Sequence, residues 1–251
     1  MENYDWCQNA VFAEDIALRT YFGSQKDYYF GDPNSANFGD FDDPKWHLPL
    51  PDLSFNPSKN DWVDAKKIVG NEEEFGNYYK FLIEKAYEYG HSFNTIRHYF
   101  WMRSSFVSES KKISVGFPWY DTHSEFSNMY NWIAKGNNGD VFSDTEQGWQ
   151  LNGIIKDDKV YFLETDDSSY PVNIETSEIF NNVCMELGRL RKFLEKNEFL
   201  VQDLIKKLTA EIGIDVWTTY HYEDNLNFGT NVWKPKNPSA SKSIFKRLFK
   251  K

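Results

Sequence analysis

Residues 149–164, WQLNGIIKDDKVYFLE, decide the fold class of this chain. The two ends of this stretch, WQLNGII and KVYFLE, are rich in apolar, β-branched and aromatic residues, which favour strands. The pair Asp157-Asp158 lies near the middle, and acidic residues at such a position are typical of a tight turn. With a third short strand over residues 170–174, the segment predicts a small antiparallel β-meander.

Helices are predicted on both sides of this meander. Residues 72–89 begin with three glutamates, which suit the positive end of a helix dipole, and continue with apolar residues at helical spacing. Residues 122–134 begin with a Thr-x-x-Glu capping box at Thr122 and Glu125. The apolar residues of segment 177–211 keep a helical repeat, so we expect one long helix or two helices joined near its middle.

The N-terminal part is predicted to be helical as well. Apolar residues at helical spacing favour helices over residues 8–22, 61–69 and 93–107, and a short strand candidate follows at 113–115. Residues 24–60 contain many prolines, glycines and aromatic residues, which predicts a long irregular segment that wraps around the protein. The sequence thus predicts an α+β fold: a helical N-terminal part with a wrapping loop, then an antiparallel meander packed against long helices.

The charge is unevenly distributed along the chain. The 251 residues have a formal net charge of −10, but the last eighteen residues, 234–251, contain seven basic and no acidic residues. Residues 1–233 hold all 38 acidic residues and only 21 basic ones, which gives this part a net charge of −17. An acidic body repels nucleic acid and anionic membranes and attracts a basic partner.

We expect one compact unit over residues 1–233, with a division near residue 110 as the alternative, and a basic tail over 234–251. Within the tail, residues 234–243 have the composition of a linker, and the apolar residues that follow lie on one arc of a short helix. The two cysteines, Cys7 and Cys184, form no pair motif, and the chain starts with no apolar leader. These features predict a cytoplasmic protein.

No complete catalytic or cofactor motif occurs in the sequence. His123-Ser-Glu125 matches the start of a zinc deaminase signature, but the two metal-binding cysteines are missing. The acidic segment 32–43 only partly follows a calcium-binding loop, and Asp157-Asp158-Lys159 resembles a nuclease motif but fits a hairpin turn better. We therefore expect no cofactor and no metal, and we favour a protein that is not an enzyme.

Two functions from different classes remain open. The first is an immunity protein or antitoxin of the kind that bacteria use, which binds and neutralises a basic toxin, for example a nuclease, through acidic and aromatic residues. The second is an enzyme with an unfamiliar site at His123, with Asp121, Asp144 and Glu146 as the nearby carboxylates. A lesser alternative is a peripheral protein with weak membrane contact through its tail.

The candidate binding residues lie in two segments. Four of them cluster in the irregular segment and are predicted to contact the partner: Asp40, Asp42, Asp43 and Trp46. The tail contributes the apolar arc and one cation: Ile244, Phe245, Arg247, Leu248 and Phe249.

Overall fold

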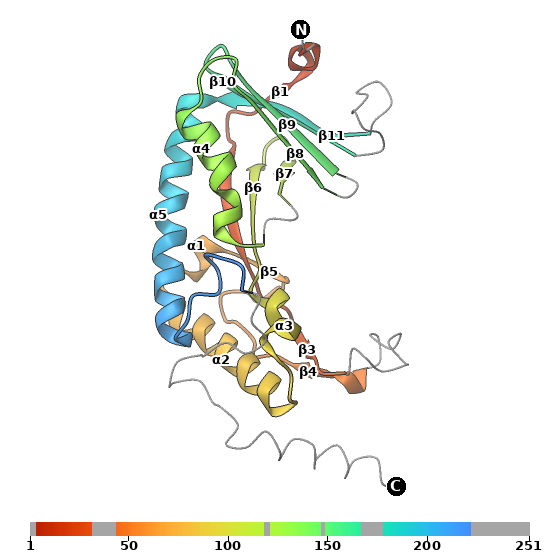
Figure 1. The fold of residues 1–251 in the computed structure, drawn as a ribbon, viewed down its shortest axis with the longest axis vertical. Helices are drawn as coiled ribbons and strands as arrows, with labels where there is room; N and C mark the ends of the chain where they lie inside the picture. Colours follow the sequence, from red (N-terminus) through yellow and green to blue (C-terminus); the bar gives the residue numbers. More distant parts are fainter. Residues whose placement is uncertain (1–3, 32–43, 118–120, 147–148, 167–177, 222–251) are drawn as a thin grey trace. The chain divides into compact units, whose positions relative to one another are not determined.

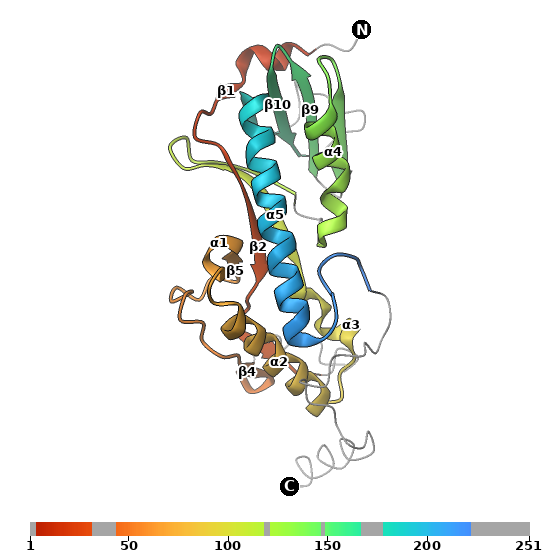
Figure 2. The ribbon, with the colours of Figure 1, turned by 90° about the vertical axis from the view of Figure 1, so that its left-hand side faces the viewer.

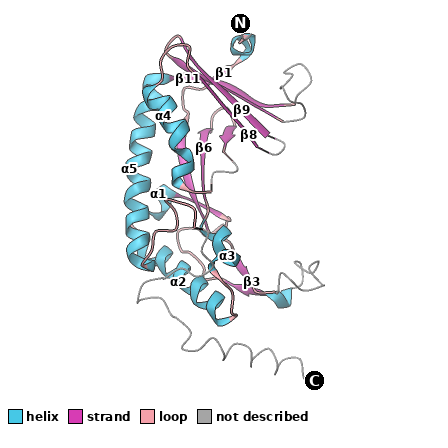
Figure 3. Ribbon diagram, viewed as in Figure 1, coloured by secondary structure: helices cyan, strands magenta, loops and turns pink. Residues whose placement is uncertain are grey.

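The structure is a computed structural model that describes residues 4–31, 44–117, 121–146, 149–166 and 178–221. It contains both helices and sheets, so the α+β class is confirmed (Figures 1 and 3). The chain divides into two compact units. Unit 1 comprises Met1–Thr20 with Arg103–Val201, and unit 2 comprises Tyr21–Met102 with Gln202–Lys251. The prediction of a single unit over 1–233 with a tail over 234–251 stays a prediction.

Unit 1 is built on a five-stranded sheet with the strand order β1-β11-β10-β9-β8. Four of these strands form an antiparallel meander, and the short β1 joins β11 in parallel. The strands are β1 (Val11–Phe12), β8 (Val141–Glu146), β9 (Trp149–Lys156), β10 (Lys159–Thr165) and β11 (Ile179–Glu186). The predicted hairpin of β9 and β10 is confirmed, because Asp157 and Asp158 both have positive φ, as a two-residue hairpin turn of this type requires.

Two helices cover one face of this sheet (Figures 1 and 2). They are α4 (Ser127–Lys135), which follows the 3-10 helix η4 (His123–Phe126), and the first part of α5 (Leu187–Ile212). Their buried residues, such as Met129 and Leu190, form one core with Phe162 and Val183 of the sheet. On the opposite face, Trp6 of η1 (Asp5–Asn9) packs in a smaller cluster with Ile154 and Leu163.

A second sheet has the strand order β5-β2-β6-β7. Its strands are β2 (Ala17–Gly23), β5 (Trp62–Asp64), β6 (Met102–Ser108) and β7 (Ile113–Gly116). The boundary between the units falls within β2, β6 and α5, so these three elements contribute residues to both units.

Unit 2 has an aromatic core around helix α2 (Glu72–Glu88). Phe75 of α2 contacts both Phe22 and Tyr79, and the Tyr79 hydroxyl donates a hydrogen bond to the Gly23 carbonyl at 2.8 Å. The smaller elements of the unit are β3 (Asp27–Tyr29), η2 (Pro44–Trp46), β4 (His47–Pro49), α1 (Ala65–Ile68), α3 (Phe93–Ile96) and η3 (Arg97–Phe100).

The prediction of a helical N-terminal part is not confirmed, because strands form where its first helix was expected. The predicted helix over 8–22 is replaced by η1, β1 and β2, and Leu18, Thr20 and Phe22 are buried at every second residue, as in a strand. The helix predicted over 93–107 ends at Phe100 and continues as β6. In the segment predicted as one or two helices over 177–211, residues 179–186 form β11, and only the remainder is helical. The candidate strand over 170–174 lies outside the described residues.

Candidate functional site

Of the predicted binding residues, the structure describes Trp46. Trp46 is half-buried, its ring lies 5.9 Å from that of Phe30, and the Lys45 ammonium lies 5.4 Å above it. The three aspartates of this cluster, Asp40, Asp42 and Asp43, lie outside the described residues, as do the tail residues Ile244, Phe245, Arg247, Leu248 and Phe249. These binding residues therefore stay predictions.

His123 contacts a carboxylate that the sequence analysis did not single out. Its Nε2 lies 3.0 Å from Oε1 of Glu198 on α5, and the two side chains are 11% and 31% exposed. Asp144 lies in β8 and does not line the hollow that contains His123. The predicted grouping of His123 with Asp121, Asp144 and Glu146 stays a prediction, and the structure adds the pair of His123 and Glu198.

The predicted capping box fixes the position of His123. Glu125 Oε2 accepts a hydrogen bond from the backbone N–H of Thr122 at 2.7 Å, which holds the start of η4. His123 is the first residue of this 3-10 helix, and α4 follows directly. The sequence motif that explains the helix start thus also orients the histidine toward α5.

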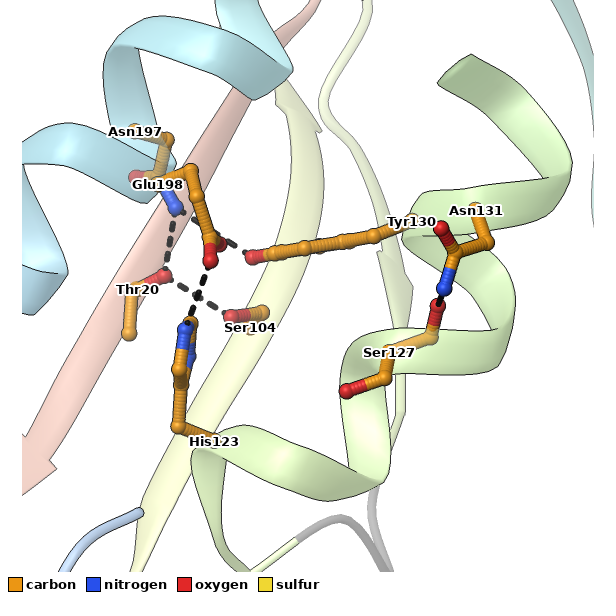
Figure 4. A network of polar contacts seen from close by, with 8 residues as sticks. All are labelled: Thr20, Ser104, His123, Ser127, Tyr130, Asn131, Asn197 and Glu198. Atoms are coloured by element: carbon orange, nitrogen blue, oxygen red, sulfur yellow. Dashed lines mark hydrogen bonds and ion pairs between the residues drawn. The ribbon is translucent and has the colours of Figure 1, made fainter. Parts of the chain in front are cut away.

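A buried polar network lies behind the pair of His123 and Glu198 (Figure 4). The Asn197 amide donates to Thr20 Oγ1 at 2.9 Å and to the Tyr130 hydroxyl at 3.4 Å. Thr20 and Ser104 share a hydrogen bond of 2.8 Å between their hydroxyl groups. Because β2, β6, α4 and α5 each contribute a residue, the network fixes the segment of α5 from which Glu198 projects.

Tyr130 remains a neutral phenol in this network. Burial raises the pKa of Tyr130 to about 12, and the charge of Glu198 adds to the effect. Its ring lies edge-on to that of His123, with the ring centres 6.1 Å apart.

His123, Tyr130 and Glu198 line an open groove of about 460 Å³, which we call the α4–α5 groove. Tyr130, Ala134 and Leu194 form its less polar part. The other residues that line it are polar or charged: His123, Ser127, Asn131, Arg191, Glu195 and Glu198. The volume falls within the range of small-molecule sites, about 300–1,000 Å³.

Arg191 is held in place at one end of the α4–α5 groove. Its Nε donates to the Ile133 carbonyl at 2.9 Å, and one terminal nitrogen donates to the Gly136 carbonyl at 2.7 Å. Both acceptors are uncharged groups at the C-terminal end of α4. Within the described part of the chain, no carboxylate forms an ion pair with this guanidinium.

Unit 2 contains a second hollow, of about 520 Å³, which we call the α2 hollow. It lies beside the N-terminal end of α2, and the described residues that line it include three carboxylates, Asp52, Glu73 and Glu74, and no cationic side chain. Leu53 and Phe81 provide apolar surface. The hollow is therefore both acidic and partly apolar.

The three carboxylates of the α2 hollow differ in their contacts. Glu74 accepts hydrogen bonds from the backbone N–H of Ser54 and, at 2.7 Å, from its hydroxyl. Asp52 forms an ion pair with Lys59 at 2.6 Å. Glu73 is exposed in the first turn of α2. Two of the carboxylates thus have fixed neighbours, and Glu73 presents its charge to solvent.

Among the described residues, no three histidine, cysteine, aspartate or glutamate side chains lie close enough to hold a metal ion.

Both cysteines are free thiols, and burial raises the pKa of Cys7 and of Cys184, which disfavours the reactive thiolate. In the part of the chain that the structure describes, no helix combines the length and the apolar character that crossing a membrane requires.

The candidate sites are thus the α4–α5 groove and the α2 hollow. Sequence reasoning identified His123 but missed Glu198 and Arg191, which lie in an amphipathic helix with no local motif around them. No protein-family model matches the chain, and the comparisons find no similar curated protein and no similar solved structure.

Proposed function

We propose that the protein binds and neutralises a basic protein partner, as an immunity protein or antitoxin does with its toxin. The observation that carries this proposal is the α2 hollow, whose described lining has three carboxylates and no cation. A nuclease toxin is the natural target class, because its substrate-binding cleft must be basic. The net charge of −17 over residues 1–233 supports the proposal, since it would speed the encounter with such a partner.

The α2 hollow suits a lysine or arginine side chain of the partner. The long aliphatic stem of such a residue would pack on Leu53 and Phe81, and its charged end would reach Glu73. The carboxylate of Glu73 needs no rearrangement for this contact because it is already exposed. Binding would therefore combine apolar burial with a charge-assisted hydrogen bond.

The test compares three forms of the tagged protein: wild type, Glu73→Lys and Glu14→Lys. A basic partner captured from the native host is identified by mass spectrometry, purified, and titrated against each form by calorimetry. We expect Glu73→Lys to weaken binding at least about tenfold, because like charges would meet in the α2 hollow. Glu14 is exposed in unit 1, so Glu14→Lys makes the same charge change outside the hollow and should retain affinity.

Two results would contradict the proposal. One is the absence of any stoichiometric basic protein on the wild-type form. The other is a captured toxin whose activity is unaffected by a saturating amount of the protein. Equal affinity of the Glu73→Lys and Glu14→Lys variants would remove the α2 hollow as the binding site.

Catalysis at the α4–α5 groove is a second candidate function, favoured by the pair of His123 and Glu198. A carboxylate bonded to one imidazole nitrogen orients the ring, so the other nitrogen can act as a general base. A metabolite-turnover screen of the wild type beside His123→Asn tests this function. Turnover that persists in the variant would exclude His123 as the base.

A further inference from the structure

Charges of opposite sign occupy different turns of α5 along the α4–α5 groove. Arg191 lies toward the C-terminal end of α4, because its guanidinium contacts the Ile133 and Gly136 carbonyls. Glu198 lies seven residues further along α5, beside His123 at the start of η4. At 1.5 Å per helical residue, the backbone positions of Arg191 and Glu198 are about 10 Å apart along the axis of α5.

The cationic end of the groove is preorganised for an anion. A guanidinium has five N–H donors, and Arg191 uses one from Nε and one from a terminal nitrogen on carbonyl oxygens. These two bonds fix its plane without neutralising its charge. The remaining donors can bind a carboxylate or phosphate group with little loss of side-chain entropy.

The acidic end is suited to a cation. Glu195 lies four residues after Arg191 and three before Glu198 on α5, so its side chain leaves the same side of the helix as both, and it lines the groove together with Glu198. His123 binds Glu198 through Nε2, and the described residues offer its Nδ1 no hydrogen-bond partner. An ammonium group at this end would meet two carboxylates and an imidazole nitrogen.

We propose that the α4–α5 groove binds a small, elongated zwitterion, with its anionic group at Arg191 and its ammonium group at Glu195 and Glu198. Tyr130, Ala134 and Leu194 would contact the aliphatic part between the two charges. The buried network of Asn197, Thr20 and Ser104 supports Tyr130 and α5, so the groove keeps its form without the ligand. This inference is independent of the binding of a basic protein at the α2 hollow.

The test uses unbranched ω-amino carboxylates of increasing chain length as probes of full-length protein. Binding is followed by chemical-shift changes of the backbone amides of Tyr130 and Asn131 in NMR spectra. We expect the affinity to pass through a maximum along the series. The corresponding simple carboxylate and simple amine should each bind at least about tenfold more weakly than the best zwitterion, since each lacks one charge-assisted contact.

Variants separate the two ends of the groove. Glu198→Gln keeps an acceptor for His123 and should weaken the zwitterion and the amine while leaving the carboxylate unchanged. Arg191→Gln should weaken the zwitterion and the carboxylate, whereas Arg189→Gln, an equal charge change at an exposed position of α5, should leave all probes unchanged. Glu198→Gln also remains informative if Arg191→Gln destabilises α4.

The proposal is overturned if no probe shifts the amides of the α4–α5 groove, or if wild type and Glu198→Gln bind the zwitterion equally. Binding of a basic protein partner is measured separately with Glu73→Lys, in unit 2. Failure of either proposal is therefore distinguishable from failure of the other.

Discussion

At the scale of single residues, His98 is a half-buried base that affects stability. Burial in unit 2, with the charge of Arg97 adding to it, lowers the pKa of His98 from 6.5 to about 4. The unfolded chain therefore binds a proton between about pH 6.5 and pH 4 that the folded chain does not bind. The free energy of unfolding is unaffected by this group above pH 6.5 and falls as the pH is lowered through this window.

We predict that His98→Gln reduces this pH dependence. Between pH 7.5 and about pH 5.5, His98 accounts for a loss of about 1.4 kcal/mol in the free energy of unfolding of the wild type, and the variant lacks this loss. Urea denaturation of both proteins at the two pH values measures it. An equal pH dependence in both would show that the imidazole is protonated in the folded protein.

Single residues also show which part of the candidate site is predictable from sequence. Thr122 and Glu125 are close in the chain, and their spacing predicts the capping box that the structure contains. Glu198 is 75 residues from His123 and has the surroundings of any other glutamate on a surface helix. Only the packing of α4 beside α5 brings the pair together, so local patterns could not reveal it.

At the scale of elements, the packing of α4 on β9 requires a glycine at position 153. A Cβ at Gly153 would lie 2.7 Å from the ring of Trp132, which is packed against Phe142 and Phe162. We predict that Gly153→Ala lowers the free energy of unfolding by about 1–3 kcal/mol, the usual cost of overpacking a core. Chemical denaturation of wild type and variant measures the change.

Gly188 in α5 is the matched control. Nothing lies within 4 Å of a Cβ added there, and alanine favours a helix over glycine. Gly188→Ala should therefore raise the free energy of unfolding by up to about 1 kcal/mol. If Gly153→Ala were as stable as wild type, the contact between Trp132 and β9 would have to be looser than the structure shows.

The elements also differ in how well periodicity predicts them. Helix α2 was predictable because its acidic first turn and its apolar spacing agree with its buried face. In residues 8–22, the spacing of Val11, Leu18 and Phe22 also fits a helix, but pairing with β5 and β6 makes the end of this segment a strand. Strand β11 was missed for a related reason: Val183 continues the apolar spacing of α5, yet it pairs with β1 and β10. Where the spacing of apolar residues fits both a helix and a strand, long-range strand pairing determines which of the two forms.

At the scale of the whole molecule, residues 1–233 are acidic and the tail is basic. This distribution predicts that the tail is the part of the protein that contacts an anionic membrane. We predict that the protein co-sediments with anionic vesicles through its tail, since each cation near the surface contributes about 1 kcal/mol. Replacing Lys246, Arg247, Lys250 and Lys251 with glutamine should remove about 4 kcal/mol and leave the protein in the supernatant.

The matched control replaces four exposed lysines outside the tail, Lys66, Lys67, Lys111 and Lys112, with glutamine. Both variants have the same net charge. A difference in pelleting between them therefore depends on where the cations lie and not on how many there are. Added salt should weaken pelleting of the wild type, because counterions screen exposed charges. If both variants pellet like the wild type, the tail makes no membrane contact, and its seven cations remain available to the acidic residues of the same chain.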